Sequence, residues 1–294
     1  LNLSSNIYLP SQKQLYHFEK DYNDYRKNIG MSKNIINDYY NYSLEDYLKH
    51  YENVKNEKII AEITPSYLFS KQAATEIHRY NPDAKLIALF RNPVDYIESI
   101  HKLLYLNNIE YIPNLIDAVN ASKLREKEHF RQSKNEKKEI ANYNERVKYS
   151  EQLLRYFKLF EKEKIKVIFY EDFKKNNQNI LNEICEFLCI DKILIKDSIK
   201  ENTSKQTKMK FIMCFKNTKI VKYISFSLSS KLRNHLGRLI RKLTTSESKS
   251  NLSSAQKIFL FNEFKHEIDD FGELLVSKGV INLKEELYEK WGLD

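Results

Sequence analysis

Short apolar runs alternate with amphipathic stretches along this chain. Nearly continuous apolar runs at 58–63, 85–90 and 166–170 predict buried strands. Apolar strands separated by helices are typical of a parallel sheet that is covered on both faces, so the pattern predicts an α/β fold, a three-layer sandwich with a central parallel sheet flanked by helices. Apolar residues at helical spacing predict helices at 70–80, 94–106, 142–164, 179–189 and 253–279.

The 294 residues, of which 41% are hydrophobic, suffice for one large domain. We therefore expect a single domain over 1–294 that ends in the helix 253–279. Residues 107–142 are polar and charge-mixed with little periodicity, which predicts an irregular insertion.

The formal net charge of +9 is concentrated in one part of the chain. Residues 202–246 contain eleven Lys and Arg and no Asp or Glu, so 9 minus 11 leaves about −2 for the remainder. This basic segment, which we expect to be helical, suits an anionic partner: a nucleotide, a nucleic acid, an acidic glycan or an anionic membrane. A merely solvated basic surface is the alternative.

Cysteines and hydropathy exclude several classes of protein. Three cysteines do not make a disulfide framework. No further Cys or His near Cys185 and Cys189 completes a metal site, so we expect both to be small buried hydrophobic residues. No apolar run is long enough to span a membrane, and no secretory signal is visible, so the expected location is cytoplasmic. The chain begins with Leu1 rather than Met, which leaves room for an upstream segment.

The exit of the strand 85–90 carries the most specific candidate chemistry. Arg91 follows the apolar run, Pro93 can open the next helix, and Ser99 lies eight residues beyond the arginine. Ligands bind where the strands of such sheets end, and an arginine fork with a hydroxyl suits a phosphate group. The alternative is that Arg91 caps an acidic neighbour and Ser99 fills a helix surface.

The motif Arg91–Ser99 resembles the site at which sulfotransferases that use 3′-phosphoadenosine 5′-phosphosulfate (PAPS) bind the 3′-phosphate of that donor. The resemblance implies the P-loop-NTPase-like sulfotransferase fold, with PAPS and an acceptor as partners, no nucleic acid and no metal. Further stretches that resemble this family occur in the family's order at 6–10, 13–18, 43–48, 61–68 and 168–173.

The chain departs from the family pattern in two places. A first strand and a Lys-x-Gly-Thr-Thr-type loop, which would hold the 5′-phosphosulfate, are absent, so we expect the chain by itself to be inactive. Gln14 stands where glycan sulfotransferases carry a catalytic glutamate. His17 is then the nearest candidate base, although a packed histidine is an equal alternative, and Glu19 and Glu62 are held in reserve.

The resemblance also gives the basic segment a role. It implies that Lys205, Lys208 and Lys210 are candidates for contacts with PAPS. The rest of the segment suits an amphipathic helix pair that lines an acceptor cleft or rests on an anionic membrane.

The expected function is transfer of the sulfuryl group of PAPS to a hydroxyl, or less favourably an amine, of a glycan, glycolipid or other metabolite. Three alternatives stay open. A nucleotide kinase would use Glu171 and Asp172 as magnesium ligands. A non-catalytic sulfotransferase-like fold and a basic nucleic-acid- or membrane-binding module are the others.

Overall fold

The computed structural model describes residues 6–12, 14–21, 43–106, 110–129, 142–195, 205–207, 245–247 and 252–293. The chain divides into two compact units, one formed by 1–199 with 254–294 and the other by 200–253. All elements below belong to the first unit unless stated otherwise.

Two pairs of parallel strands form the sheet structure of the first unit. Strand β1 (Ile7–Tyr8) pairs with β2 (Ile59–Ile60), and β3 (Leu86–Phe90) pairs with β4 (Ile165–Phe169) over five residues. The α/β class and the parallel pairing are thus confirmed, while the strand expected at 58–63 is shorter. The described residues show two separate pairs, so the three-layer sandwich stays a prediction.

Most of the expected helices form within a few residues of their predicted bounds. They are α4 (Ala73–Tyr80), α5 (Pro93–Leu106), α11 (Asn177–Leu188) and α15 (Ser254–Ser277). The unit also contains shorter elements, among them α3 (Leu44–Lys49), η1 (Pro65–Tyr67), α10 (Tyr170–Lys175) and α16 (Glu285–Trp291).

The long helix predicted at 142–164 is broken into α8 (Tyr143–Val147), α9 (Tyr149–Phe157) and the 3₁₀ turn η2 (Lys162–Lys164). Lys148 interrupts it with a φ of −69° and a ψ of 56°, which is not helical. The side-chain amide of Gln152 donates to the carbonyl of Glu145 at 2.8 Å. This carbonyl near the end of α8 thereby has a hydrogen-bond donor in place of the one that a continuous helix would supply.

The expectation of an irregular insertion at 107–142 is wrong for its centre, where α6 spans Leu115–His129. Leu115, Ala118, Val119 and Ser122 are buried and lie at helical spacing. These four side chains form a narrow buried face of α6, which packs against α8. The charged residues around that face hide its periodicity in the sequence.

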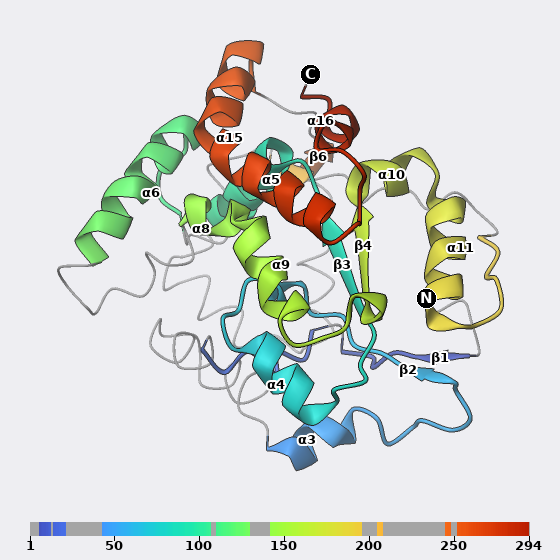
Figure 1. The fold of residues 1–294 in the computed structure, drawn as a ribbon. Coiled ribbons are helices and arrows are strands. Elements are labelled where there is room, and N and C mark those ends of the chain that lie inside the picture. Colours follow the sequence, from blue (N-terminus) through green and yellow to red (C-terminus); the bar gives the residue numbers. More distant parts are fainter. Residues whose placement is uncertain are drawn as a thin grey trace, which may run out of the picture. The chain divides into compact units, whose positions relative to one another are not determined.

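An aromatic core covers one face of β3 and β4. The ring of Phe90 lies 4.6 Å from that of Phe271 on α15 and 5.1 Å from that of Tyr149 on α9. Trp291 of α16 stacks on Phe271 with centroids 5.9 Å apart. Figure 1 shows β3 and β4 side by side, with α9 and α15 crossing near them. Residues from distant parts of the sequence thus close this face.

The other face of β3 is partly exposed. Ile87 and Leu89 alternate along the strand with the more buried residues, and their side chains are 40% and 55% exposed. On β4 the corresponding face is covered by α11, where Lys166 pairs with Glu183 at 2.8 Å. A buried strand normally has both faces covered in an α/β sheet, so β3 has apolar surface available for further packing.

The two cysteines near the end of α11 have different environments. Cys185 is fully buried, as expected. The expectation that Cys189 is buried is wrong, because the helix ends at Leu188 and Cys189 takes a left-handed conformation, with a φ of 58°, on the surface. Its amide closes the helix end by bonding to the carbonyls of Cys185 and Glu186.

In the second unit, β5 (Lys205–Thr207) and β6 (Thr245–Glu247) form an antiparallel pair. The remainder of the basic segment 202–246 lies outside the described residues, so its predicted helices are not addressed by the structure.

Candidate functional site

Arg91 leaves the carboxyl end of β3 beside the end of β4. The register pairs Phe90 with Phe169, so the residues that follow, Arg91 and Tyr170, are neighbours. The guanidinium carbon of Arg91 lies 4.8 Å from the centre of the Tyr170 ring. A planar guanidinium stacks well on an aromatic face, so this contact fixes the plane of the arginine.

Arg91 keeps unused donor capacity. Its Nη2 lies 3.5 Å from Asp95, longer than the 2.7–2.9 Å typical of a charge-assisted hydrogen bond, and both side chains are more than one-third exposed. Its Nε is buried, and no hydrogen-bond partner for it exists within the described ranges. Arg91 does meet an acidic neighbour, but the weak contact leaves the guanidinium able to bind a second anion.

Ser99 lies on α5, one turn beyond Asp95, and is partly exposed. Residues four apart share a helix face, so Ser99 lies on the same face of α5 as Asp95, which Arg91 meets. The start of this helix is fixed by Asn92, whose side-chain oxygen accepts from the amide of Val94 at 2.9 Å. The order predicted from the sequence, a strand, an arginine and then a helix, is therefore present.

Asn92 and Glu171, whose roles at this site were not predicted, connect its elements. The Asn92 amide donates to Glu171 at 3.0 Å, and the Asn92 side chain donates to the carbonyl of Trp291 at 2.8 Å. Burial raises the pKa of Glu171, while the Asn92 amide and the Arg91 charge oppose that rise. Asn92 could have been recognised as a helix cap before Pro93, but its contact with a residue 199 positions away left no signal in the sequence.

The carboxylates proposed as magnesium ligands for a kinase have other partners. Glu171 accepts the Asn92 amide, and Asp172 pairs with Lys290 at 2.7 Å. Within the described part of the chain no three His, Cys, Asp or Glu side chains are grouped as metal ligands would be.

His17 lies in a short segment after β1 and is half-buried among aromatic rings. Its imidazole stacks on Tyr47 with centroids 4.4 Å apart and meets the edge of Phe18 at 4.9 Å. Burial lowers the pKa of His17 below its usual 6.5; the Lys20 charge lowers it further, and Glu76 opposes this. The imidazole is therefore neutral at pH 7 and able to accept a proton.

The other candidate bases occupy different environments. Gln14 is exposed and accepts a hydrogen bond from the Tyr16 hydroxyl. Glu19 is fully buried. Glu62, which follows β2, accepts hydrogen bonds from the hydroxyls of Tyr47 and Tyr67 at 2.9 and 2.5 Å.

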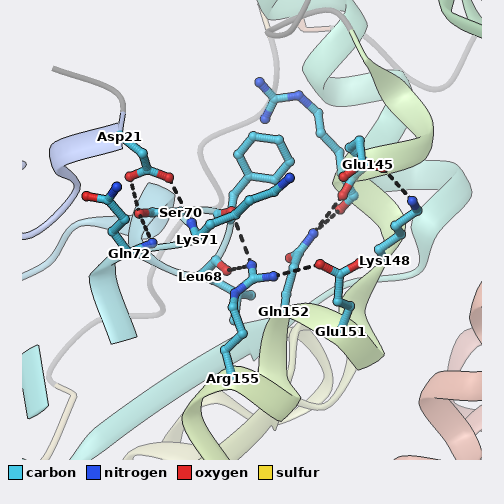
Figure 2. Close-up of polar contacts among 12 residues, drawn as sticks. Asp21, Leu68, Ser70, Lys71, Gln72, Glu145, Lys148, Glu151, Gln152 and Arg155 are labelled. Atoms are coloured by element: carbon cyan, nitrogen blue, oxygen red, sulfur yellow. Dashed lines mark hydrogen bonds and ion pairs between the residues drawn. The ribbon is translucent and has the colours of Figure 1, made fainter. Parts of the chain in front are cut away.

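The far end of the His17 segment is anchored to the turn before α4. Asp21 accepts from the Ser70 hydroxyl at 2.5 Å and from the Lys71 amide at 2.8 Å. Arg155 of α9 holds the same turn from the other side, because its Nη2 donates to the carbonyls of Leu68 and Phe69 at 3.1 and 3.2 Å (Figure 2). The segment that carries His17 is thereby tied to the body of the unit.

The three lysines predicted to contact PAPS belong to the basic segment. Lys205 belongs to β5, but its side chain is not described, and Lys208 and Lys210 lie outside the described residues. Within the described helices, none is both long enough and apolar enough to cross a membrane.

Comparison with known proteins identifies the class. A model of the sulfotransferase domain matches residues 11–272, nearly the whole chain. The chain therefore belongs to the sulfotransferase domain family.

One solved structure agrees with this assignment at the level of the fold. The crystal structure of a sulfotransferase from Alicyclobacillus acidocaldarius superposes with a TM-score of 0.54 at 22% identity, covering 81% of this chain and 86% of that one. The sulfotransferase domain from the curacin biosynthetic pathway matches with a TM-score of 0.32 at 18% identity, covering 61% of this chain and 58% of that domain. The first match supports a sulfotransferase fold.

A curated relative is similar over a short stretch. The membrane-associated sulfotransferase kil1 of Dictyostelium discoideum is 38% identical over 63 residues, or 20% of this chain. The match spans 13% of that protein's length, so its activity and location are not transferred to this chain by the comparison.

Proposed function

We propose that this chain forms the core of a sulfotransferase that moves the sulfuryl group of PAPS to a hydroxyl, or less favourably an amine, of a glycan, glycolipid or other metabolite. Membership of the sulfotransferase domain family supports the reaction class. The donor and the role of each residue are inferred from two places, Arg91 with Ser99 after β3 and His17 in the segment after β1.

Arg91 carries the proposal for donor binding. Its guanidinium is oriented by Tyr170, is partly exposed and retains a buried Nε that lacks a partner among the described residues. An anion with several oxygens, such as the 3′-phosphate of PAPS, would satisfy such a fork. Ser99 adds a neutral hydroxyl donor from the same side of α5.

His17 is the proposed base for the transfer. The acceptor oxygen attacks sulfur, a new sulfur–oxygen bond forms, and the bond from sulfur to the 5′-phosphate oxygen breaks. The leaving group, adenosine 3′,5′-bisphosphate, keeps the electron pair of the broken bond. The proton of the acceptor hydroxyl passes to the neutral imidazole, whose lowered pKa favours the unprotonated form at pH 7.

Catalysis also needs a group that holds the 5′-phosphosulfate. None of the five glycines in the chain is followed by Thr-Thr, so no loop of the expected type is present. We propose that a strand and a loop of that type are needed to complete the site, and the exposed Ile87 and Leu89 of β3 offer apolar surface for such packing. The chain printed here would then be inactive alone, and a longer chain with that segment would be active. A longer chain that still fails to transfer sulfuryl would support a non-catalytic role.

Donor binding is tested by titrating adenosine 3′,5′-bisphosphate in a calorimeter. Arg91→Ala removes charge-assisted hydrogen bonds worth about 1.5–3 kcal/mol, so affinity should fall by about ten- to a hundredfold. Arg79→Ala, which alters a largely exposed arginine of α4, should bind like the parent chain. Equal affinity of Arg91→Ala and the parent would refute the proposed site.

The nucleic-acid alternative is separated by salt. Binding of RNA through many phosphates weakens steeply as salt rises, whereas binding of one nucleotide changes less. If RNA binds with a steep salt dependence and adenosine 3′,5′-bisphosphate does not bind, the proposal that the chain is a sulfotransferase is refuted.

We further propose that the basic segment 202–246 contacts an anionic membrane. Its eleven positive charges without a carboxylate support this, and the Dictyostelium relative is described as membrane-associated. Vesicles that contain phosphatidylserine should sediment the chain, and phosphatidylcholine vesicles should not. Replacing Arg233, Arg238 and Arg241 by Gln should weaken that sedimentation, and an unchanged result would reject the proposed contact.

A further inference from the structure

We infer that Glu62 is a positioning residue that sets the orientation and the environment of His17. The inference deepens the proposed function, because it matters for catalysis only if His17 is the base. It depends on a hydrogen-bond network around one carboxylate that connects β2, α3, η1 and the segment 14–18.

Glu62 accepts three hydroxyl donors. Its Oε1 accepts from Thr64 at 2.7 Å and from Tyr67 at 2.5 Å, and its Oε2 accepts from Tyr47 at 2.9 Å. Hydrogen bonds to a charged acceptor are shorter and stronger than neutral ones. Three such donors at one carboxylate fix the directions of the three hydroxyl groups.

Two of these hydroxyls hold the backbone on either side of His17. The amide of Leu15 donates to the Thr64 hydroxyl oxygen at 3.2 Å. The amide of Phe18 donates to the Tyr67 hydroxyl oxygen at 3.4 Å. Because each hydroxyl donates its hydrogen bond to Glu62, its lone pairs remain available to accept from these amides.

The third hydroxyl belongs to Tyr47, the residue on which His17 stacks. The two rings have centroids 4.4 Å apart and planes 19° apart. The Tyr47 hydroxyl also lies 3.1 Å from that of Tyr51, so the phenol is held at its polar end. Fixing Tyr47 therefore fixes the surface that the imidazole faces.

The hydroxyls stay protonated throughout the physiological range. Burial raises the pKa of Tyr47 and of Tyr67, and the nearby Glu62 charge raises both further. Both tyrosines therefore act as donors to Glu62. With three donors on its two oxygens, Glu62 is better suited to holding the segment than to accepting a proton from an acceptor substrate.

The test measures the pKa of His17 by NMR titration of the chain printed here, which needs no catalytic activity. The seven histidines require assignment, and His17→Gln identifies the signal. In Glu62→Gln an NH2 group, which donates, replaces one of the two acceptor oxygens, so the donors compete for the other oxygen and the segment loosens. Greater hydration of the ring should then move the His17 pKa upward, toward 6.5, and remove the upfield shift due to the Tyr47 ring.

The sign of this change separates positioning from simple charge removal. Loss of a negative charge would by itself lower the pKa of a histidine or leave it unchanged. A His17 pKa that falls or does not move in Glu62→Gln overturns the inference. Tyr47→Phe, which keeps the ring but loses one contact to Glu62, should give a smaller upward shift.

Asp21→Asn is the matched control, because Asp21 anchors the far end of the same segment through the Ser70 hydroxyl and the Lys71 amide. It should leave the His17 pKa unchanged, and a shift as large as that of Glu62→Gln would show general loosening instead. In an active longer chain, Glu62→Gln should lower kcat about tenfold with little change in KM for the donor. If His17→Ala keeps full activity, the proposed base is wrong, whereas the NMR result still decides the role of Glu62.

Discussion

The imidazole of His17 and the phenol of Tyr47 stack nearly parallel, with centroids 4.4 Å apart. This pairing joins a residue of the segment after β1 to one of α3, and the two residues are far apart in the sequence. It places a half-buried imidazole with a lowered pKa next to a fixed aromatic surface. The electrostatics of this imidazole can therefore be tested directly.

Two neighbouring charges should move the His17 pKa in opposite directions. Lys20 lowers it and Glu76 raises it, and these two side chains pair with each other. Lys20→Gln should raise the His17 pKa and Glu76→Gln should lower it, because a nearby positive charge disfavours the imidazolium and a nearby negative charge favours it. NMR titration gives both values. Shifts of the same sign in the two variants would contradict this electrostatic account.

Asp95 should compete with the donor nucleotide for Arg91. The carboxylate lies 3.5 Å from the guanidinium in a partly exposed pair, worth about 1 kcal/mol or less. Asp95→Asn should therefore strengthen binding of adenosine 3′,5′-bisphosphate by about two- to fivefold in a calorimetric titration. Asp83→Asn, which alters another exposed pair, should have no effect. Weaker binding by Asp95→Asn would mean that Asp95 orients Arg91 rather than competing for it.

Glu171 should make the free energy of unfolding depend on pH. Its pKa in the folded chain is raised above 4.5 by burial, so the ionised form is disfavoured there. Protonated Glu171 therefore contributes its full share of the free energy of unfolding below about pH 4.5, and this contribution is lost as the pH rises through the pKa of the folded chain. Glu171→Gln should therefore gain stability relative to the parent as pH rises from 4.5. Denaturant titrations from pH 4.5 to 8 measure this, with the exposed Glu186→Gln as control; a constant difference across that range would refute it.

The aromatic core should depend strongly on Phe271. This side chain is fully buried and contacts Phe90, Tyr149 and Trp291. Phe271→Ala should cost about 3–5 kcal/mol in the free energy of unfolding, as is usual for large-to-small changes in cores. Phe259→Ala on the same helix, at a 39% exposed position, should cost about 1 kcal/mol or less. Equal losses would show that α15 does not pack through Phe271.

Arg155 should not be replaceable by lysine. Its guanidinium bonds to two carbonyls, those of Leu68 and Phe69, and to Glu151 at 3.1 Å (Figure 2). A lysine ammonium cannot reproduce this fork, so Arg155→Lys should lose about 1–3 kcal/mol of unfolding free energy. Arg79→Lys, in an exposed pair within α4, should lose little by the same denaturation measurement. A fully stable Arg155→Lys protein would show that the charge alone is sufficient.

The sequence by itself determined the local elements and the class of the chain. Apolar runs with clear boundaries predicted β3, β4 and most long helices, since burial of a strand or of one helix face requires that pattern. The motif that begins at Arg91 placed an arginine after a strand and a serine on the following helix, as the structure shows. Family membership then followed from resemblance over most of the chain and was confirmed.

Only the tertiary structure decided how distant residues meet. The helix α6, the break at Lys148 and the exposure of Cys189 depend on packing and chain direction that periodicity does not encode. The contact of Asn92 with Trp291 and the three hydroxyls around Glu62 join residues remote in sequence. Local propensity reports which face of an element is apolar, whereas the partner of each polar group is fixed by burial, because a buried polar atom must find its hydrogen bond within the fold.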